Sequence, residues 1–227
     1  MDDFQSRFDE VRSKIARAAG RCGRTASDVT LIAVSKTHPP ESVRAAFACG
    51  QTVFGENRVQ ELLAKAPECP SAIHWHLIGH LQSNKIRKAL PLSEMIHGVD
   101  SLDLARDIDR IAGELGLFPK ILLEVNAGGE ASKFGFQPDR LESEIAALME
   151  LPRVGVEGLM TVAPYVEDPE VVRPIFRSLR TIRDRCSAIA RADLPILSMG
   201  MTGDYEVAIE EGATHVRIGT ALFGTRA

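Results

Sequence analysis

The sequence predicts an α/β protein whose single domain, residues 1–227, folds as a (β/α)8 TIM-type barrel with an extra N-terminal helix. Eight short apolar runs are spread along the chain as candidate strands. Helix-like segments separate most of these runs, and this alternation indicates parallel βα units. A length of 227 residues suits one such barrel.

The chain begins with the pattern of an amphipathic helix. Gly20 and Gly23 are expected to end this helix, because glycine is the usual residue after a helix C-terminus. Apolar residues recur at spacings of three and four and form one stripe, which consists of Phe4, Phe8, Val11, Ile15 and Ala19.

The first apolar run, residues 29–34, is typical of a strand buried on both faces, as in a parallel sheet. Ser101 and Pro138 are typical helix starts, and Gly116 is a typical helix stop. The helix-like segments are residues 40–50, 101–116, 137–151 and 168–192. The expected strands are residues 29–34, 51–54, 73–78, 95–99, 120–125, 154–159, 194–198 and 214–218.

An open, doubly wound sheet would use the same elements, and counting elements alone does not distinguish it from a barrel. No GxGxxG follows the first apolar run, so the usual support for a dinucleotide-binding sheet is absent. We therefore expect the barrel.

Composition narrows the function classes. The net charge of -4 and the pI near 5.9 argue against a nucleic-acid surface, which needs clustered Lys and Arg. The N-terminus lacks the apolar core of a signal peptide, and no segment approaches the roughly 20 apolar residues that span a bilayer. Without CxxC spacing, the cysteines are expected to be reduced thiols of a cytoplasmic protein: Cys22, Cys49, Cys69 and Cys186.

The loops after the strands of a (β/α)8 barrel converge on one face, where its chemistry gathers. Residues just after the expected strands are therefore the candidates for a functional site. They include Ser35, Lys36, Gly55, Glu56, Asn57, Gly79, His80, Gln82, Asn84, Asn126, Met160, Thr161, Ser198, Gly200, Thr202, Gly219 and Thr220.

The last two of these loops predict a small phosphate site. The segment SMGMTGDYEVAIEEG combines glycines with the hydroxyls of Ser198 and Thr202, and RIGTALFG adds Arg217, Gly219 and Thr220. Backbone amides and hydroxyls at helix starts bind phosphate without a large basic patch. Tight turns would explain either loop alone, but two such loops in consecutive units favour a phosphate site.

Lys36 directly follows the first apolar run, in VTLIAVSKTHPP. An amine at a barrel mouth can form a Schiff base with an aldehyde or ketone, although a lysine that only extends into solvent is the commoner case. Beside a phosphate site, a phosphorylated carbonyl compound would use both features; pyridoxal 5'-phosphate (PLP) and the sugar phosphates of barrel aldolases are of this kind. Lys133, in a loop, is a rival amine that we expect to be more hydrated.

Two other polar clusters have structural explanations. His74, His76 and His80 have spacings of two and four, but no neighbouring cysteine or carboxylate completes a metal site, so no metal is expected. The basic segment 80–90 lacks interleaved aromatic residues and predicts a solvated helix rather than a nucleic-acid surface. Lys85 in this segment is a candidate for the rim of the barrel mouth.

Six segments in this order resemble the pyridoxal phosphate homeostasis (YggS/PROSC) family over essentially the whole chain. They are AVSKTHP, FGENRVQE, WHLIGHLQSNK, VNAGGEASKFGF, GLMTVAP and SMGMTGDYEVAIEEGATHVRIGTALFG. The resemblance implies a fold-type III PLP barrel, similar to the N-terminal domain of alanine racemase, with PLP bound as an internal aldimine of Lys36. It implies that the other cofactor-binding residues are Asn57, Met160, Ser198, Gly200, Thr202, Arg217, Gly219 and Thr220.

This sequence departs from the family at two positions. Thr202 stands where the family more often has Ser, and Leu77 where it more often has Phe. The first change keeps a hydroxyl and the second keeps an apolar side chain. Both changes are therefore compatible with the resemblance.

The resemblance also implies a carrier or regulator in intracellular PLP homeostasis, acting by storage, delivery or buffering without established turnover. The sequence ends soon after the eighth strand, so we expect no second domain with the further acid/base residue of a racemase. The alternatives are a racemase-like PLP enzyme, which would exchange an α-proton, and an aldolase-like barrel, which would trap a sugar phosphate. The implied partners are PLP and apo forms of PLP-dependent enzymes, and the implied state is a monomer.

Overall fold

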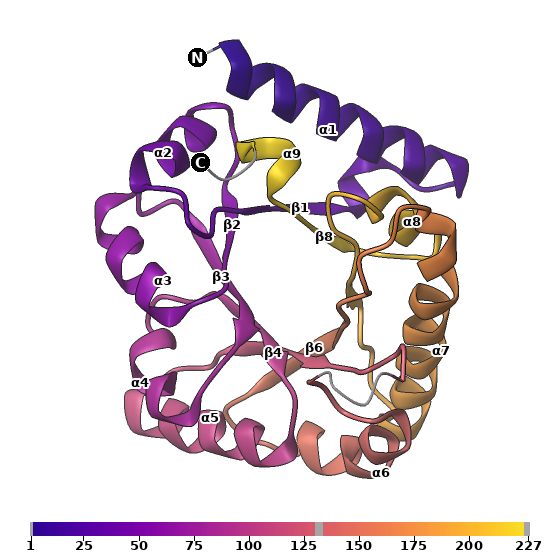
Figure 1. Cartoon of the computed structure of the whole chain (residues 1–227). Coiled ribbons are helices and arrows are strands. Elements are labelled where there is room, and N and C mark those ends of the chain that lie inside the picture. Colours follow the sequence, from indigo (N-terminus) through magenta and orange to yellow (C-terminus); the bar gives the residue numbers. More distant parts are fainter. Residues whose placement is uncertain (1, 130–133, 225–227) are drawn as a thin grey trace.

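Eight parallel strands close into a barrel in the computed structural model, which describes residues 2–129 and 134–224 (Figure 1). The strands are neighbours in chain order, and β1 pairs with β8. This closure confirms the predicted barrel and excludes the open sheet. The strands are β1 (Thr30–Val34), β2 (Val53–Glu56), β3 (His74–His80), β4 (Met95–Val99), β5 (Lys120–Glu124), β6 (Gly155–Met160), β7 (Ile196–Ser198) and β8 (His215–Ile218).

Helices follow the strands and form the outer layer of the barrel (Figure 1). Within the described parts of the chain, none of them combines the length and apolarity needed to cross a membrane. Short 3-10 turns occur at Ala26–Asp28, Ala66–Glu68, Ser83–Lys85 and Pro169–Val172. The helices are α1 (Asp2–Arg21), α2 (Pro40–Ala48), α3 (Val59–Lys65), α4 (Ile86–Ala89), α5 (Leu102–Leu115), α6 (Pro138–Met149), α7 (Arg173–Ala190), α8 (Tyr205–Glu210) and α9 (Thr220–Phe223).

Every predicted strand is present, with its ends within two residues of the expected ones. The Ser101 side chain accepts a hydrogen bond from the Leu104 amide at the start of α5, and Gly116 ends this helix with a φ of 70°. The first helix runs through Gly20, so only Gly23, with a φ of 72°, acts as its stop. Helix α3 was not predicted, because it is too short to show a helical period, whereas α4 lies in the basic segment 80–90 that was expected to be helical.

Helix α1 completes the helical layer beside β1 and β8. The two helices of the last units, α8 and α9, have only 6 and 4 residues, so they cover these strands incompletely. Helix α1 has 20 residues, packs against both α8 and α9, and crosses outside β1 in Figure 1. Its predicted apolar stripe is the face it buries: Phe8, Val11, Ile15 and Ala19 are buried, and Phe4 is partly buried.

Apolar side chains form two separate clusters. The larger cluster fills the layer between the sheet and the helices. The smaller one consists of Met95, Leu122 and Met160, with Ile196 packed against it. Because alternate residues of a strand face opposite sides of the sheet, these positions point into the barrel. They share the interior with polar residues at inward positions of β3, β4, β7 and β8, namely His76, His97, Ser198, His215 and Arg217.

Candidate functional site

A cavity of about 570 Å³, here called the mouth cavity, opens at the carboxyl ends of the strands. The pairing of β1 with β8 brings Lys36, which follows β1, beside Gly219, which follows β8. The approach is close, because a side-chain atom on Gly219 would lie 3.3 Å from the Val34 carbonyl oxygen. The polar residues on this cavity are Lys36, Asn57, Thr202, Asp204, Arg217 and Thr220.

Most of the residues predicted to bind a cofactor line this cavity, and three do not. Met160 belongs to the apolar cluster inside the barrel. Ser198 is fully buried below the mouth, and Gly200 is buried with its carbonyl oxygen accepting the Arg217 amide at 3.0 Å. The residues that line the mouth cavity are Lys36, Asn57, Thr202, Arg217, Gly219 and Thr220.

The turn that carries Lys36 is held on its N-terminal side by a buried ion pair. Ser35 Oγ donates a hydrogen bond to Glu56 Oε1 at 2.7 Å. Lys65 Nζ, from α3, donates to the same Glu56 oxygen at 2.7 Å and to the Ser35 carbonyl oxygen at 2.8 Å. Burial raises the pKa of the Glu56 carboxyl, while the Lys65 and Ser35 hydrogen bonds oppose that rise. These contacts fix the backbone immediately before Lys36.

Lys65 also holds the turn that carries Lys36 on its C-terminal side. The Thr37 amide donates to Glu61 Oε2 at 2.7 Å, and Lys65 Nζ reaches that oxygen at 3.1 Å. Thr37 has a φ of 67°, a left-handed conformation that costs a non-glycine residue about 1–2 kcal/mol. The carboxylate therefore stabilises a strained residue, and the position of Lys36 is determined from both sides.

Arg217 brings a buried positive charge to the mouth cavity. One guanidinium nitrogen, Nη1, donates to Ser198 Oγ at 2.7 Å, and Nη2 donates to the Thr161 carbonyl oxygen at 2.8 Å. Burial lowers the pKa of Arg217 to about 10, and the charges of Glu124 and Asp204 act in the opposite direction. The side chain is thus a cation at neutral pH, held in one orientation by its hydrogen bonds.

A chain of hydrogen bonds continues from Arg217 down through the barrel. Ser198 Oγ lies 3.0 Å from His97 Nδ1, and His97 Nε2 lies 3.0 Å from His76 Nδ1. Burial lowers the pKa of His76 to about 3 and that of His97 well below its usual value, so both rings are neutral. A neutral imidazole donates from one nitrogen and accepts at the other, which allows such a chain to be satisfied.

The loop after β7 is shaped by Gly200 and Asp204. Gly200 has a φ of 93°, and a side-chain atom there would lie 2.6 Å from the Ala208 Cβ, so only glycine allows α8 to pack this closely. Asp204 Oδ1 accepts the Met201 amide at 2.6 Å, and burial raises the pKa of this carboxyl. Asp204 was not predicted, although aspartate side chains commonly accept hydrogen bonds from nearby backbone amides.

The rest of the cavity wall is apolar. It comes from four different loops or strand ends, and Tyr165 in it is 90% exposed at the rim. These residues were not predicted, since apolar residues near strand ends look like ordinary core positions in a sequence. They are Val34, Ile78, Val162, Tyr165, Val166 and Met201.

The other sequence candidates lie apart from the mouth cavity. Lys133 is outside the described residues. Lys85 lines a neighbouring cavity instead. His74 bonds Glu94 at the outside, His76 lies inside the barrel, and His80 pairs with Asp100 at 3.2 Å. Within residues 2–129 and 134–224 no group of three or more His, Cys, Asp or Glu side chains is placed to hold a metal ion.

Comparisons with known proteins agree with this fold. Residues 7–227 match the family described as alanine racemase, N-terminal domain. The chain is 46% identical to the pyridoxal phosphate homeostasis protein of Aquifex aeolicus, over 97% of both chains. The structure of PipY from Synechococcus elongatus with PLP bound has a TM-score of 0.83 and 44% identity, covering 92% of this chain and 100% of that one.

Alanine racemase of Clostridium difficile is similar in fold alone. Its identity is 16% and its TM-score 0.78, and the likeness covers 100% of this chain but 57% of the racemase. With the full-length match to Aquifex aeolicus, these relationships confirm the family expected from the sequence. The chain belongs to the alanine racemase N-terminal domain family and, within it, to the pyridoxal phosphate homeostasis proteins.

Proposed function

We propose that this chain binds PLP in the mouth cavity, holds it covalently through the Lys36 amine, and serves PLP homeostasis by storing, delivering or buffering the cofactor. The relative from Aquifex aeolicus is named for this role, and the PipY structure contains PLP. One observation carries the proposal: an amine, Lys36, and a buried guanidinium, Arg217, reach the same cavity from the paired strands β1 and β8.

The residues of the mouth cavity fit the chemical groups of PLP. Its volume of about 570 Å³ is within the range of small-ligand pockets. The apolar wall, which includes Val34 and Ile78, suits a planar aromatic ring. The Thr202 and Thr220 hydroxyls, with the open space around Gly203, suit a phosphate group.

Each group on the cavity has a defined task in this proposal. PLP supplies an aldehyde that condenses reversibly with a primary amine and releases water. Lys36 supplies the amine from a turn that the Lys65 contacts hold in place. Arg217 supplies a fixed positive charge, and Asn57 an amide. Of the buried residues, Ser198 and Gly200 bond Arg217, and Met160 packs inside the barrel.

The groups around the cavity favour storage over turnover. Among its described lining residues there is no imidazole, and the Tyr165 side chain is 90% exposed at the rim. Asp204, which supplies a carboxyl group, is bonded to the Met201 amide. Racemisation needs positioned acid/base groups on the two faces of the substrate. We therefore propose a carrier without racemase turnover.

The first experiment is a PLP titration of the purified protein, with visible spectra recorded before and after borohydride. We expect a band that borohydride removes in the wild type and that Lys36→Ala lacks. Lys88→Ala, which changes an exposed lysine on α4, is the matched control and should keep the band. A reducible band that persists in Lys36→Ala would contradict the assignment of Lys36.

A second measurement separates the carrier from an enzyme. Alanine in deuterated water is expected to keep its α-proton in the presence of the PLP-loaded protein. Exchange that depends on Lys36 would contradict the carrier and support a racemase-like enzyme.

The setting of this function is also part of the proposal. We place the protein in the cytoplasm as a monomer that passes PLP to apo forms of PLP-dependent enzymes. Light scattering should then give a mass near 24.7 kDa; a dimer would contradict the monomer. The free thiols suit a reducing compartment, and they are Cys22, Cys49, Cys69 and Cys186.

A further inference from the structure

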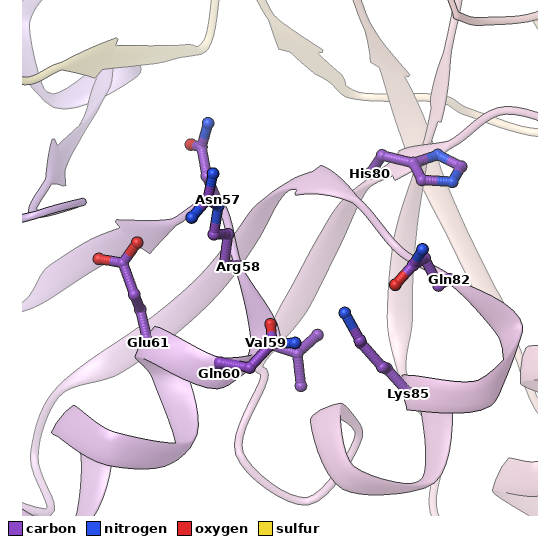
Figure 2. Close-up of a pocket in the computed structure, with 8 residues that line it drawn as sticks. All are labelled: Asn57, Arg58, Val59, Gln60, Glu61, His80, Gln82 and Lys85. Carbon is purple, nitrogen blue, oxygen red and sulfur yellow. The ribbon is translucent and has the colours of Figure 1, made fainter.

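A second cavity, of about 560 Å³, lies beside the mouth cavity (Figure 2). It is formed by the segment after β2 and the segment after β3, and Asn57 lines both cavities. Asn57 is held closely by β3, because a side-chain atom on Gly79 would lie 2.4 Å from the Asn57 carbonyl oxygen. The two cavities therefore share a fixed wall.

Two cationic side chains on the second cavity have no hydrogen-bond partner. Within residues 2–129 and 134–224, the side chains of Arg58 and Lys85 make no hydrogen bond and no ion pair, although the charge of Arg58 helps to lower the pKa of the Glu61 carboxyl. Arg87, two residues beyond Lys85, is by contrast paired with Glu114. Lys85 is half-buried, so its charge is only partly solvated and an anion would compensate it.

The acidic group on this cavity, Glu61, already has hydrogen-bond donors. The Glu61 carboxylate accepts hydrogen bonds from Lys65 Nζ at 3.1 Å and from the Thr37 amide at 2.7 Å. Figure 2 shows this carboxylate on the opposite side of the cavity from the Lys85 amine, whose end points into the space between Val59 and Gln82. The charged side chains on the cavity that lack a hydrogen bond are therefore the two cations, Arg58 and Lys85.

We propose that the second cavity is an anion site that binds a phosphate monoester, with Arg58 and Lys85 as its cationic ligands. A guanidinium matches the phosphate oxygens with two parallel donors, and an ammonium adds a point charge. The amides of Asn57 and Gln82 add neutral donors. The site does not involve Lys36, so it goes beyond the proposed function. Its place across Asn57 from the mouth cavity makes it a holding site for a phosphorylated ligand that enters or leaves.

The test uses the full chain with the mouth cavity blocked. Protein loaded with one equivalent of PLP is reduced with borohydride, which fixes the ligand at Lys36. The reduced protein is then titrated calorimetrically with pyridoxine 5'-phosphate, a phosphate monoester without an aldehyde. We expect one further binding site per chain.

Two variants locate that site. Arg58→Gln combined with Lys85→Gln should weaken binding by about tenfold or more, because charge-assisted hydrogen bonds are lost. Lys88→Gln, on the helix α4 that follows Lys85 but outside the cavity, should leave the affinity unchanged. A blocked wild type that binds nothing would overturn the proposal, and so would an equal loss in Lys88→Gln.

A parallel titration with inorganic phosphate shows whether the site binds free phosphate or a phosphate monoester. A site that takes inorganic phosphate and rejects pyridoxine 5'-phosphate would overturn the assignment of a monoester. The blocking step tests the proposed function separately. If no reducible adduct forms on Lys36, the Lys36→Ala variant replaces the blocked protein, and the second site is still measured.

Discussion

The layer between the sheet and the helices differs from the barrel interior in the side chains that fill it. The outer layer is a continuous apolar cluster whose largest fully buried side chains include Phe8, Phe54 and Phe176. The interior contains a small apolar cluster of Met95, Leu122 and Met160, and a separate chain of hydrogen-bonded polar side chains. That chain consists of His76, His97, Ser198 and Arg217.

This difference separates the source of stability from the source of function. Burial of apolar surface stabilises by about 25 cal/mol per Å², so the outer layer contributes most of the folding free energy. Buried polar groups cost free energy unless they are hydrogen-bonded, so they add little net stability. Their chain ends at Arg217 on the mouth cavity. Changes in the outer layer should thus lower stability alone, and changes in the polar chain should also weaken PLP binding.

The largest expected effect is in the outer layer. Phe176→Ala on α7 should lower the free energy of unfolding by about 3–5 kcal/mol, because it leaves a cavity in a fully buried position. The folded variant should bind PLP as the wild type does. Urea unfolding and a PLP titration measure the two properties. Ile189→Ala, on the same helix but 48% exposed, is the matched control. Loss of PLP binding by folded Phe176→Ala would contradict the claim that the outer layer affects stability alone.

Lys65 is an exception in the outer layer, since it is a buried charge there. Lys65→Met should cost about 3 kcal/mol, because the Glu56 carboxylate stays buried without its partner. It should also slow PLP capture by loosening the turn that carries Lys36. Adding Glu56→Leu should restore much of the stability but not the capture rate. Lys14→Met, at an exposed pair on α1, is the control; equal effects there would contradict this role of Lys65.

A change in the polar chain should weaken PLP binding as well as stability, whereas Phe176→Ala should lower stability alone. His97→Phe removes the partner of both Ser198 and His76, at a cost of about 1–2 kcal/mol. PLP affinity should fall severalfold, because Arg217 loses the support of Ser198. His74→Phe changes an exposed ring and should alter neither property. Unchanged PLP affinity in folded His97→Phe would show that the chain has no part in binding.

The smallest effect is a pH dependence of stability. The His76 ring has a pKa of about 3 in the folded protein, against 6.5 for an ordinary histidine. The unfolded state binds more protons in this window, so stability is full above pH 6.5 and falls as the pH drops toward 3. Between pH 7 and pH 6 this ring contributes a loss of about 0.7 kcal/mol. Between these two pH values, the free energy of unfolding of His76→Gln, measured with urea, should fall by about 0.7 kcal/mol less than that of the wild type. An equal fall in both proteins would contradict a neutral His76 ring.

The barrel and most of the mouth cavity could be predicted because local patterns encode them. Short apolar runs alternating with helical segments determine the strand order, and closure then brings the strand ends together. Lys36 and Arg217 were predicted for this reason. The apolar walls and Asp204 were missed, since single residues near strand ends carry no periodic signal.

Contacts between distant segments could not be predicted in the same way. Lys65 reaches the Ser35 carbonyl across 30 residues, from a helix of 7 residues that has no clear period. Ser198 was expected in a phosphate loop, whereas its hydroxyl bonds His97 and Arg217 below the mouth. The second cavity depends on which charges remain unpaired after folding, which no motif records.

The measurement that tests the central claim most directly is peptide mapping by mass spectrometry after PLP loading and borohydride reduction. The account predicts one pyridoxyl group per chain, on the peptide that contains Lys36. A reduced adduct on Lys65, Lys85 or Lys133 instead would contradict the assignment of the polar mouth of the barrel as the PLP site.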